Sequence, residues 1–317
     1  MYQADYTAII SPFLPAGAYV LEITEPAMRK AVLAADFDGD HALEVAAAYR
    51  FQNDDYVLIL KHGAQGWFPA GHFQGKSRYF MDFYKEEARF VAAEAVGDVT
   101  GDGIQDTVFL TASQTPDSPF LQNITLQIRN GATGQVEKIP LKENAGYDPT
   151  VFLGDFTGDK KDDILVIINT GGSGGLIYAY IYTYEKGQYK LIFDDESFNK
   201  SNTYTVTYLD QFKARVTSAN PPKKYLLDLQ YKGKEYLSEI YNSDRTLKEP
   251  VEGWVAPLSG LYPVDFERDG IYELDTYQNV AGRYSADGLG YMMNVLKWDG
   301  TSFKTDRQSI AVFGEET

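Results

Sequence analysis

The stretch Val96-Gly97-Asp98-Val99-Thr100-Gly101-Asp102-Gly103-Ile104-Gln105-Asp106 places oxygen-bearing side chains at alternate positions between two apolar runs. It also contains glycines, which accept the positive φ angles of a tight turn at little cost. The same pattern returns at residues 34–45, 153–164 and 263–274, and the first aspartates of the four segments lie 62, 57 and 110 residues apart. The chain is therefore organised by an internal repeat.

Each period of about 57 residues predicts four short strands separated by turn residues. Four strands per repeat at this spacing are typical of the blades of a β-propeller. The sequence therefore predicts an all-β fold, a β-propeller of about five four-stranded antiparallel blades. The strands expected in the first and third repeats are Ala31–Ala35, Leu43–Tyr49, Tyr56–Lys61 and Trp67–Phe73, and Thr150–Leu153, Ile164–Asn169, Leu176–Tyr184 and Tyr189–Phe193.

The predicted domain organisation is a lead segment over residues 1–30, which can supply a closing strand, and a single propeller over 31–317. Its repeats begin near residues 31, 91, 150, 203 and 260. The repeat near 203 is inferred from the doubled last spacing, and around Asp210 it has one acid and no glycine. We interpret it as a repeat that kept its strands and lost its acidic loop. Ser77–Arg89 and Glu235–Lys248 fit helical or extended structure equally well.

The four acidic loops have the composition of calcium sites, because Ca²⁺ takes about six to eight oxygen ligands. A nine-residue loop can offer side-chain oxygens from positions 1, 3, 5 and 9 and a main-chain carbonyl from position 7. Carboxylates this close together also repel one another unless a cation is present. The sequence predicts up to four bound Ca²⁺ ions. The candidate ligands are Asp36, Asp38, Asp40, Ala42 and Glu44; Asp98, Thr100, Asp102, Ile104 and Asp106; Asp155, Thr157, Asp159, Lys161 and Asp163; and Asp265, Glu267, Asp269, Ile271 and Glu273.

The acidic loops have two other interpretations, an EF-hand and a polar turn. An EF-hand loop needs a glutamate at position 12 and a helix on either side, whereas position 12 is Ala47, Phe109, Val166 and Thr276, with strand-like flanks. Alternatively, the acids are solvated side chains of polar turns, and the fourfold repetition of the spacing favours calcium over this alternative. The position-6 glycine is replaced by His41 and Lys160, and the position-4 glycine by Arg268.

The composition limits the partners. The 317 residues include 29 Lys and Arg against 45 Asp and Glu, which gives a formal net charge of −16. An acidic protein does not attract nucleic-acid phosphates or anionic membranes, and no apolar run approaches the roughly 20 residues of a membrane span. We expect no nucleic-acid partner and no membrane insertion. The chain has no cysteine, and its first residues show no signal-peptide pattern.

The acidic loops resemble the calcium-binding loops of FG-GAP/VCBS repeats, found in integrin α-subunit propellers and in many bacterial surface or secreted proteins. The resemblance covers roughly Ala31 to Phe313 and rests on the four loops. It implies a calcium-stabilised propeller in which each loop joins the first and second strands of a blade. It also implies an extracytoplasmic or cell- or spore-surface location. The fold does not identify the partner.

Antiparallel strands alternate in direction, so loops between the second and third strands should lie on the face opposite the acidic loops. By analogy with the family, ligands prefer that opposite face. Arg283, Tyr284 and Asp287 are its tentative ligand residues, since Arg283 and Tyr284 could grip a carboxylate or stack on a sugar. The alternative is a well-capped turn. The segments expected on this face are Arg50–Asp55, Ala112–Phe120, Thr170–Gly175 and Ala281–Leu289, with the connection Ser77–Arg89.

Signals for catalysis are few. Residues Gly171–Gly175 match the G-x-S-x-G nucleophile motif, which needs a following helix and a later histidine. The next segment has the pattern of a strand, and His41, His62 and His72 all precede the motif. We therefore predict a non-enzymatic binding or adhesion module with a protein or carbohydrate ligand. A carbohydrate-active enzyme or lectin using the same face, and a purely structural component of a surface or spore layer, are the alternatives.

Overall fold

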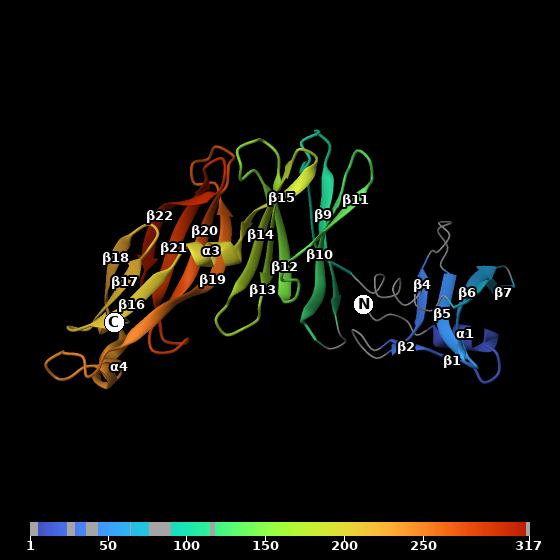
Figure 1. Ribbon diagram of the computed structural model, residues 1–317, viewed down its shortest axis with the longest axis horizontal. Helices are drawn as coiled ribbons and strands as arrows, with labels where there is room; N and C mark the ends of the chain where they lie inside the picture. The colour runs from blue at the N-terminus through green and yellow to red at the C-terminus, as the bar shows by residue number, and fades with distance from the viewer. Residues whose placement is uncertain are drawn as a thin grey trace. The chain divides into compact units, whose positions relative to one another are not determined.

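The computed structural model describes residues 6–23, 29–35, 44–63, 65–75, 90–114 and 118–314. Antiparallel β-sheets form most of the regular structure, and the described helices are short (Figure 1). The chain divides into two compact units, unit 1 with residues 1–90 and 112–121 and unit 2 with residues 91–111 and 122–317. None of the described helices is long and apolar enough to cross a membrane.

Unit 1 contains a five-stranded antiparallel sheet organised around β5. One edge of β5 pairs with both β1 and β4, and the other edge pairs with β6, which in turn pairs with β7. A two-stranded ribbon of β2 and β3 lies outside this sheet. The elements are α1 (Thr7–Ile10), η1 (Ser11–Phe13), β1 (Tyr19–Val20), β2 (Glu22–Ile23), β3 (Arg29–Lys30), β4 (Val32–Ala35), β5 (Glu44–Phe51), β6 (Asp54–Gly63) and β7 (Gly66–Gln74).

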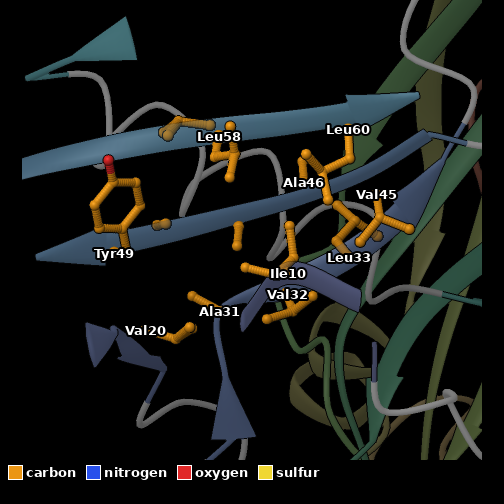
Figure 2. Packing of buried hydrophobic residues seen from close by; sticks show 13 residues of the cluster. Ile10, Val20, Ala31, Val32, Leu33, Val45, Ala46, Tyr49, Leu58 and Leu60 are labelled. Carbon is orange, nitrogen blue, oxygen red and sulfur yellow. The ribbon is translucent and has the colours of Figure 1, made fainter. Parts of the chain in front are cut away.

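The core of unit 1 forms where β5 is buried on both of its faces. Residues 44–49 are all buried, and three of them are alanines at positions 46–48, whose small side chains leave room for neighbouring elements on both sides. Ile10 of α1, Leu33 of β4 and Leu58 of β6 pack in this cluster (Figure 2). Burial of apolar surface, worth about 25 cal/mol per Å², stabilises this arrangement.

Two four-stranded antiparallel sheets follow, and in each of them neighbouring strands are consecutive in the chain. The strands expected for the first and third repeats are present, which confirms the all-β class and the antiparallel four-stranded sheets. The strands are β8 (Phe90–Gly97), β9 (Asp106–Gln114), β10 (Leu121–Arg129) and β11 (Val136–Pro140), then β12 (Tyr147–Gly154), β13 (Asp163–Asn169), β14 (Ile177–Glu185) and β15 (Gln188–Asp194).

The remainder of unit 2 is one seven-stranded sheet in the order β18-β17-β16-β19-β20-β21-β22. Its edge strands are linked, because the Tyr225 hydroxyl of β18 donates to the Gln308 carbonyl of β22 over 3.1 Å. The Gln308 amide also donates to Ser218 of β17, at 3.2 Å. These bonds make the sheet a nearly closed barrel. Its strands are β16 (Tyr204–Leu209), β17 (Lys213–Ser218), β18 (Lys223–Asp228), β19 (Glu252–Val264), β20 (Glu273–Ala281), β21 (Gly288–Trp298) and β22 (Phe303–Ala311).

This sheet differs from the separate repeats expected from about residues 203 and 260. Val206 and Thr207 of β16 pair with Gly253 and Glu252 of β19, so the two groups of strands share an edge. After β18 the chain forms η2 (Gln230–Lys232) and α4 (Gly233–Ile240) in place of a fourth strand. Leu237 and Ile240 are buried because α4 is amphipathic. A third helix, α3 (Asp195–Ser201), precedes β16.

Candidate metal-binding loops

Three of the four predicted acidic loops lie among the described residues, all in unit 2. Loop 2 (Asp98–Asp106) joins β8 to β9, loop 3 (Asp155–Asp163) joins β12 to β13, and loop 4 (Asp265–Glu273) joins β19 to β20. Of loop 1 (residues 36–44), Asp36, Asp38, Asp40 and Ala42 lie outside the described residues, and only Glu44, the first residue of β5, lies within them.

The three loops share one hydrogen-bond scaffold, which begins at the position-1 aspartate. Its Oδ2 atom accepts the main-chain N–H of position 6, and the Oδ1 atom of the position-5 aspartate accepts the N–H of position 7. These bonds are Asp98–Gly103 (2.8 Å), Asp155–Lys160 (2.8 Å) and Asp265–Gly270 (3.0 Å), then Asp102–Ile104 (2.8 Å), Asp159–Lys161 (3.1 Å) and Asp269–Ile271 (3.0 Å). The spacing of the acids therefore sets the path of the backbone.

The position-9 acid is the first residue of the second strand and is buried in all three loops. Its carboxylate accepts main-chain N–H groups from the start of the loop. Asp106 accepts the N–H groups of Val99 and Thr100 at 3.2 and 3.1 Å. The equivalent bonds link Asp163 to Phe156 and Thr157, at 2.9 and 3.1 Å, and Glu273 to Phe266, at 3.0 Å. Hydrogen bonds of this kind offset the cost of burying a carboxylate.

The scaffold imposes positive φ angles at positions 4 and 6 whether or not glycine is present. Gly101 and Gly103 of loop 2 have φ of 78° and 83°. Lys160 and Arg268, which stand where other loops have glycine, have φ of 67° and 59°. A side chain in this region costs about 1–2 kcal/mol, so the loop hydrogen bonds must hold these residues in place.

The loops are joined in series by two repeated contacts. The position-8 N–H of each later loop donates to the position-1 carbonyl of the preceding one, from Asp162 to Asp98 over 3.1 Å and from Tyr272 to Asp155 over 2.8 Å. The position-7 side chain of each later loop also covers the position-4 glycine of the preceding loop. Arg268 occupies position 4 of loop 4, the last loop of this row.

The oxygens of loop 3 fit a hard cation best. The Thr157 hydroxyl and Asp163 Oδ1, at positions 3 and 9, are buried and make no hydrogen bond within the described part of the chain. Burial raises the pKa of Asp163 to about 6, although the nearby Thr183 hydroxyl and the Phe156 N–H favour the charged form. Two buried oxygens at ligand positions without hydrogen-bond partners are the donors that a calcium ion uses.

The carboxylates of a loop do not converge on one point as they stand. Among the described residues, no group of three or more His, Asp and Glu side chains is close enough to hold a metal. The position-1 and position-5 carboxylates are directed toward the main-chain N–H groups of their own loop. Cation binding would therefore require the half-buried position-1 and the exposed position-5 side chains to rotate while the position-9 acid stays in place.

Sequence reasoning missed two lysines that lie beside these loops. Lys297 of β21 contacts the carboxylate of Glu267, and its Nζ lies 3.5 Å from Oε1 of Glu273. The Nζ atom of Lys61, in β6, lies 3.5 Å from Oε1 of Glu44. In each case one whole strand separates the acidic loop from the strand that carries the lysine. Only the register between these two strands brings the lysine next to the loop.

The tentative ligand residues of the β20–β21 loop have partners within the protein. Asp287 is 2% exposed, forms an ion pair with Lys232 at 2.7 Å and accepts the Tyr236 hydroxyl at 2.7 Å. Although burial alone would raise it, these partners keep the pKa of Asp287 below its ordinary value. Arg283 pairs with Glu239 at 2.7 Å, and only Tyr284, 56% exposed, projects into solvent. The arrangement is that of a capped turn.

A hollow in the surface lies where β13 ends and β14 begins, at the end of β13 opposite loop 3. Its volume is about 890 Å³, and its lining includes Thr170 and Leu176, which flank the G-x-S-x-G segment. Strand β14 follows that segment directly, so the helix of a nucleophile motif is not present there. The remaining lining residues include Lys142, Glu143, Tyr178, Tyr180, Asp195 and Glu196.

Comparison with known proteins finds two similarities. The family described as the YybI C-terminal domain matches residues 202–311, which coincide with the seven-stranded sheet. A Bacillus subtilis (strain 168) protein, named "Uncharacterized protein YybI", is 54% identical over 229 residues. That match covers 72% of this chain and 87% of the relative.

Proposed function

The chain belongs to the YybI family, and we propose that it is a calcium-binding repeat protein of the FG-GAP/VCBS type. In this proposal the four-stranded sheets are blades of a β-propeller of about five blades, the last of them joined in the seven-stranded sheet. The protein acts as a non-enzymatic binding or adhesion module for a protein or carbohydrate ligand. Calcium stabilises the end of the sheets that carries the acidic loops.

One observation carries the calcium proposal. In loop 3, Thr157 Oγ1 and Asp163 Oδ1 are buried at ligand positions and have no hydrogen-bond partner in the described part of the chain. Asp155 and Asp159 of the same loop would supply the remaining carboxylates, with the position-7 carbonyl of Lys161. A bound calcium ion would provide positive charge where these acids repel one another. This chain's own residues hold the loop in shape, because the main-chain bonds to Asp155 and Asp163 are already formed.

A bound ion would also stabilise neighbouring sheets together. Loops 2, 3 and 4 are linked in a row through the Asp162–Asp98 and Tyr272–Asp155 main-chain bonds. Any ligand that binds only the folded state raises its stability, by about 2.7 kcal/mol when present at 100 times its dissociation constant. Calcium at loop 3 would thus hold the strands on both sides of the row.

Thermal unfolding in calcium and in chelator tests this proposal. We expect the melting temperature to rise by several degrees on adding millimolar CaCl₂ to the chelator-treated protein, and to fall again with excess EDTA. Thr157→Val with Asp159→Asn should remove most of the rise. Glu185→Gln, which removes an exposed carboxylate outside the loops, is the matched control and should keep it. An unchanged melting temperature in the unsubstituted protein would refute the calcium role.

A second candidate, a lectin or carbohydrate-active enzyme, is favoured by the hollow beside β14. It combines tyrosines with the acids Glu143, Asp195 and Glu196, a composition suited to sugar hydroxyls. Burial raises the pKa of Asp195, and its Oδ1 accepts the Ala179 N–H at 3.0 Å. Acids with raised pKa values are also required for glycoside hydrolysis.

An oligosaccharide array probed in the presence of calcium tests the second candidate. Binding that is lost in Tyr178→Ala and kept in Tyr284→Ala would assign the ligand to the hollow. The reverse result would assign it to the β20–β21 loop. If the protein retains and cleaves no glycan, the binding module with a protein ligand is favoured.

A further inference from the structure

Lys297 inserts a positive charge into loop 4. Its ammonium contacts the carboxylate of Glu267 at position 3 and lies 3.5 Å from the carboxylate of Glu273 at position 9. Glu273 is almost completely buried, and the Lys297 side chain is 31% exposed. Lysine is charged at neutral pH, so both contacts are ion pairs. The ammonium therefore lies between two of the four acids predicted to bind calcium.

The register of the sheets shows that this contact is part of a pattern. Leu274 pairs with Leu296, so the next residues in register, Glu273 and Lys297, face each other across β20 and β21. In unit 1, Val45 pairs with Leu60, which brings Glu44 opposite Lys61. The Nζ–Oε1 distance there is again 3.5 Å. A glutamate at position 9 is thus accompanied by a lysine on the third strand in both cases.

In loop 3 the position-9 acid is an aspartate, and the residue opposite it is not a lysine. Ile164 pairs with Tyr182, which brings Asp163 opposite Thr183, an uncharged residue. In loop 2 the buried Asp106 accepts a main-chain N–H, that of Gly131, over 2.8 Å. Asp at position 9 therefore has a neutral partner, and Glu at position 9 has an ammonium.

Loop 3 also has a lysine beside it, but this lysine contacts the position-5 acid and not the acid at position 9. Lys161 pairs with Asp159 at position 5, at 2.8 Å, and donates to the carbonyl of Tyr184 over 2.6 Å. Among the residues that the structure describes, Thr157 and Asp163 have no positively charged neighbour at hydrogen-bond distance. In loop 4, by contrast, a divalent ion at Glu267 and Glu273 would meet the ammonium of Lys297 directly, and like charges at this distance repel strongly.

We propose that the Lys297 ammonium takes the place of a divalent cation in loop 4, so that this loop is stabilised without metal. Lys61 provides the same positive charge to Glu44. The inference rests on the proposed calcium role of loops 2 and 3, and it removes loop 4 from the four calcium sites that the spacing predicts. Loop 4 keeps the backbone of a calcium loop because its ammonium and main-chain bonds suffice.

Counting bound calcium tests the inference, with equilibrium dialysis against CaCl₂ as the measurement. Lys297→Thr places in loop 4 the residue that faces Asp163 in loop 3, and Lys297→Thr with Glu273→Asp copies that pair completely. Lys304→Thr is the matched control, because Lys304 is exposed and pairs with Lys297 on the neighbouring strand. We expect the double variant to bind one calcium ion more than the unsubstituted protein and the control.

Each outcome decides between the two proposals. If the unsubstituted protein binds calcium and neither Lys297 variant gains an ion, the inference is overturned and the proposed function stands. If only the Lys297 variants bind an ion, Lys297 does keep calcium out of loop 4, while the proposed calcium role of loops 2 and 3 fails. If no protein binds calcium, both fail. Should Lys297→Thr not fold, Lys297→Met keeps the aliphatic part of the side chain and takes its place.

A measurement without metal gives a second readout. In EDTA, Lys297→Thr should melt below Lys304→Thr, because only the first leaves Glu273 buried without its cation. Addition of CaCl₂ should close most of that gap. Equal melting temperatures of the two variants in EDTA would contradict a stabilising role of the Lys297 ammonium.

Discussion

Loops 3 and 4 share one pattern of hydrogen bonds between acids and backbone, and a lysine contacts different acids in each: Asp159 in loop 3, and Glu267 and Glu273 in loop 4. In both, the position-1 aspartate accepts the position-6 N–H and the position-9 acid accepts the position-2 N–H. In loop 3 two buried ligand oxygens have no hydrogen-bond partner in the described part of the chain, whereas in loop 4 Lys297 reaches the acids from the next strand. Hydrogen bonds from main-chain N–H groups to the acidic side chains therefore account for the loop shape in both cases.

The largest effect should come from removing a position-9 acid. Asp106→Ala leaves the buried N–H of Val99 and the less buried N–H groups of Thr100 and Gly131 without their acceptor, and a buried group without a partner costs about 1–3 kcal/mol. We expect a loss of roughly 3 kcal/mol or more in the free energy of unfolding, measured by urea denaturation in EDTA. Glu273→Ala removes one such bond and the Lys297 contact, and should cost less. A larger loss for Glu273→Ala than for Asp106→Ala would contradict this expected order.

The pH dependence of Asp163 gives an effect of about 3 kcal/mol at most. Its folded-state pKa is raised to about 6, from 3.8 in the unfolded chain, so the stability associated with its protonated form is complete below about pH 4 and lost as the pH rises through 6. In EDTA, the free energy of unfolding of Asp163→Asn relative to the unsubstituted protein should therefore increase from pH 4 to pH 7.

Calcium should invert this difference at pH 7, because a cation favours the charged carboxylate that the asparagine variant lacks. Urea denaturation of both proteins at pH 4, 5, 6 and 7, with and without CaCl₂, provides the measurement. A pH-independent difference in EDTA would show that the Asp163 carboxyl ionises in the folded protein as it does in the unfolded chain.

The smallest effect concerns the non-glycine residues with positive φ. Lys160→Gly and Arg268→Gly should each stabilise the protein by up to about 1 kcal/mol, because glycine adopts this conformation without steric cost. Gly103→Ala, the reverse change at a position with open space around it, should destabilise by a similar amount. Melting temperatures in EDTA are sufficient to rank the three variants. Equal effects at Lys160 and at the nearby Lys161, whose φ is not positive, would argue against backbone strain.

The sequence predicted the elements that depend on local pattern. Short apolar runs located strands such as β5 and β13, and the regular spacing of Asp98, Asp102 and Asp106 located a loop between two strands. These features are encoded within ten or so neighbouring residues, because side-chain alternation and turn chemistry act over that range. The calcium ligands predicted from the same spacing remain a hypothesis.

Tertiary structure alone decided which residues meet across strands. Glu273 and Lys297 are far apart in the chain, and only the register of β20 with β21 brings them together. The same holds for Tyr225 and Gln308, whose bond nearly closes the seven-stranded sheet where the sequence predicted separate repeats. Register depends on the packing of whole strands, so a local pattern of acids specifies the bend of a loop and leaves the partner of its buried carboxylate to the fold.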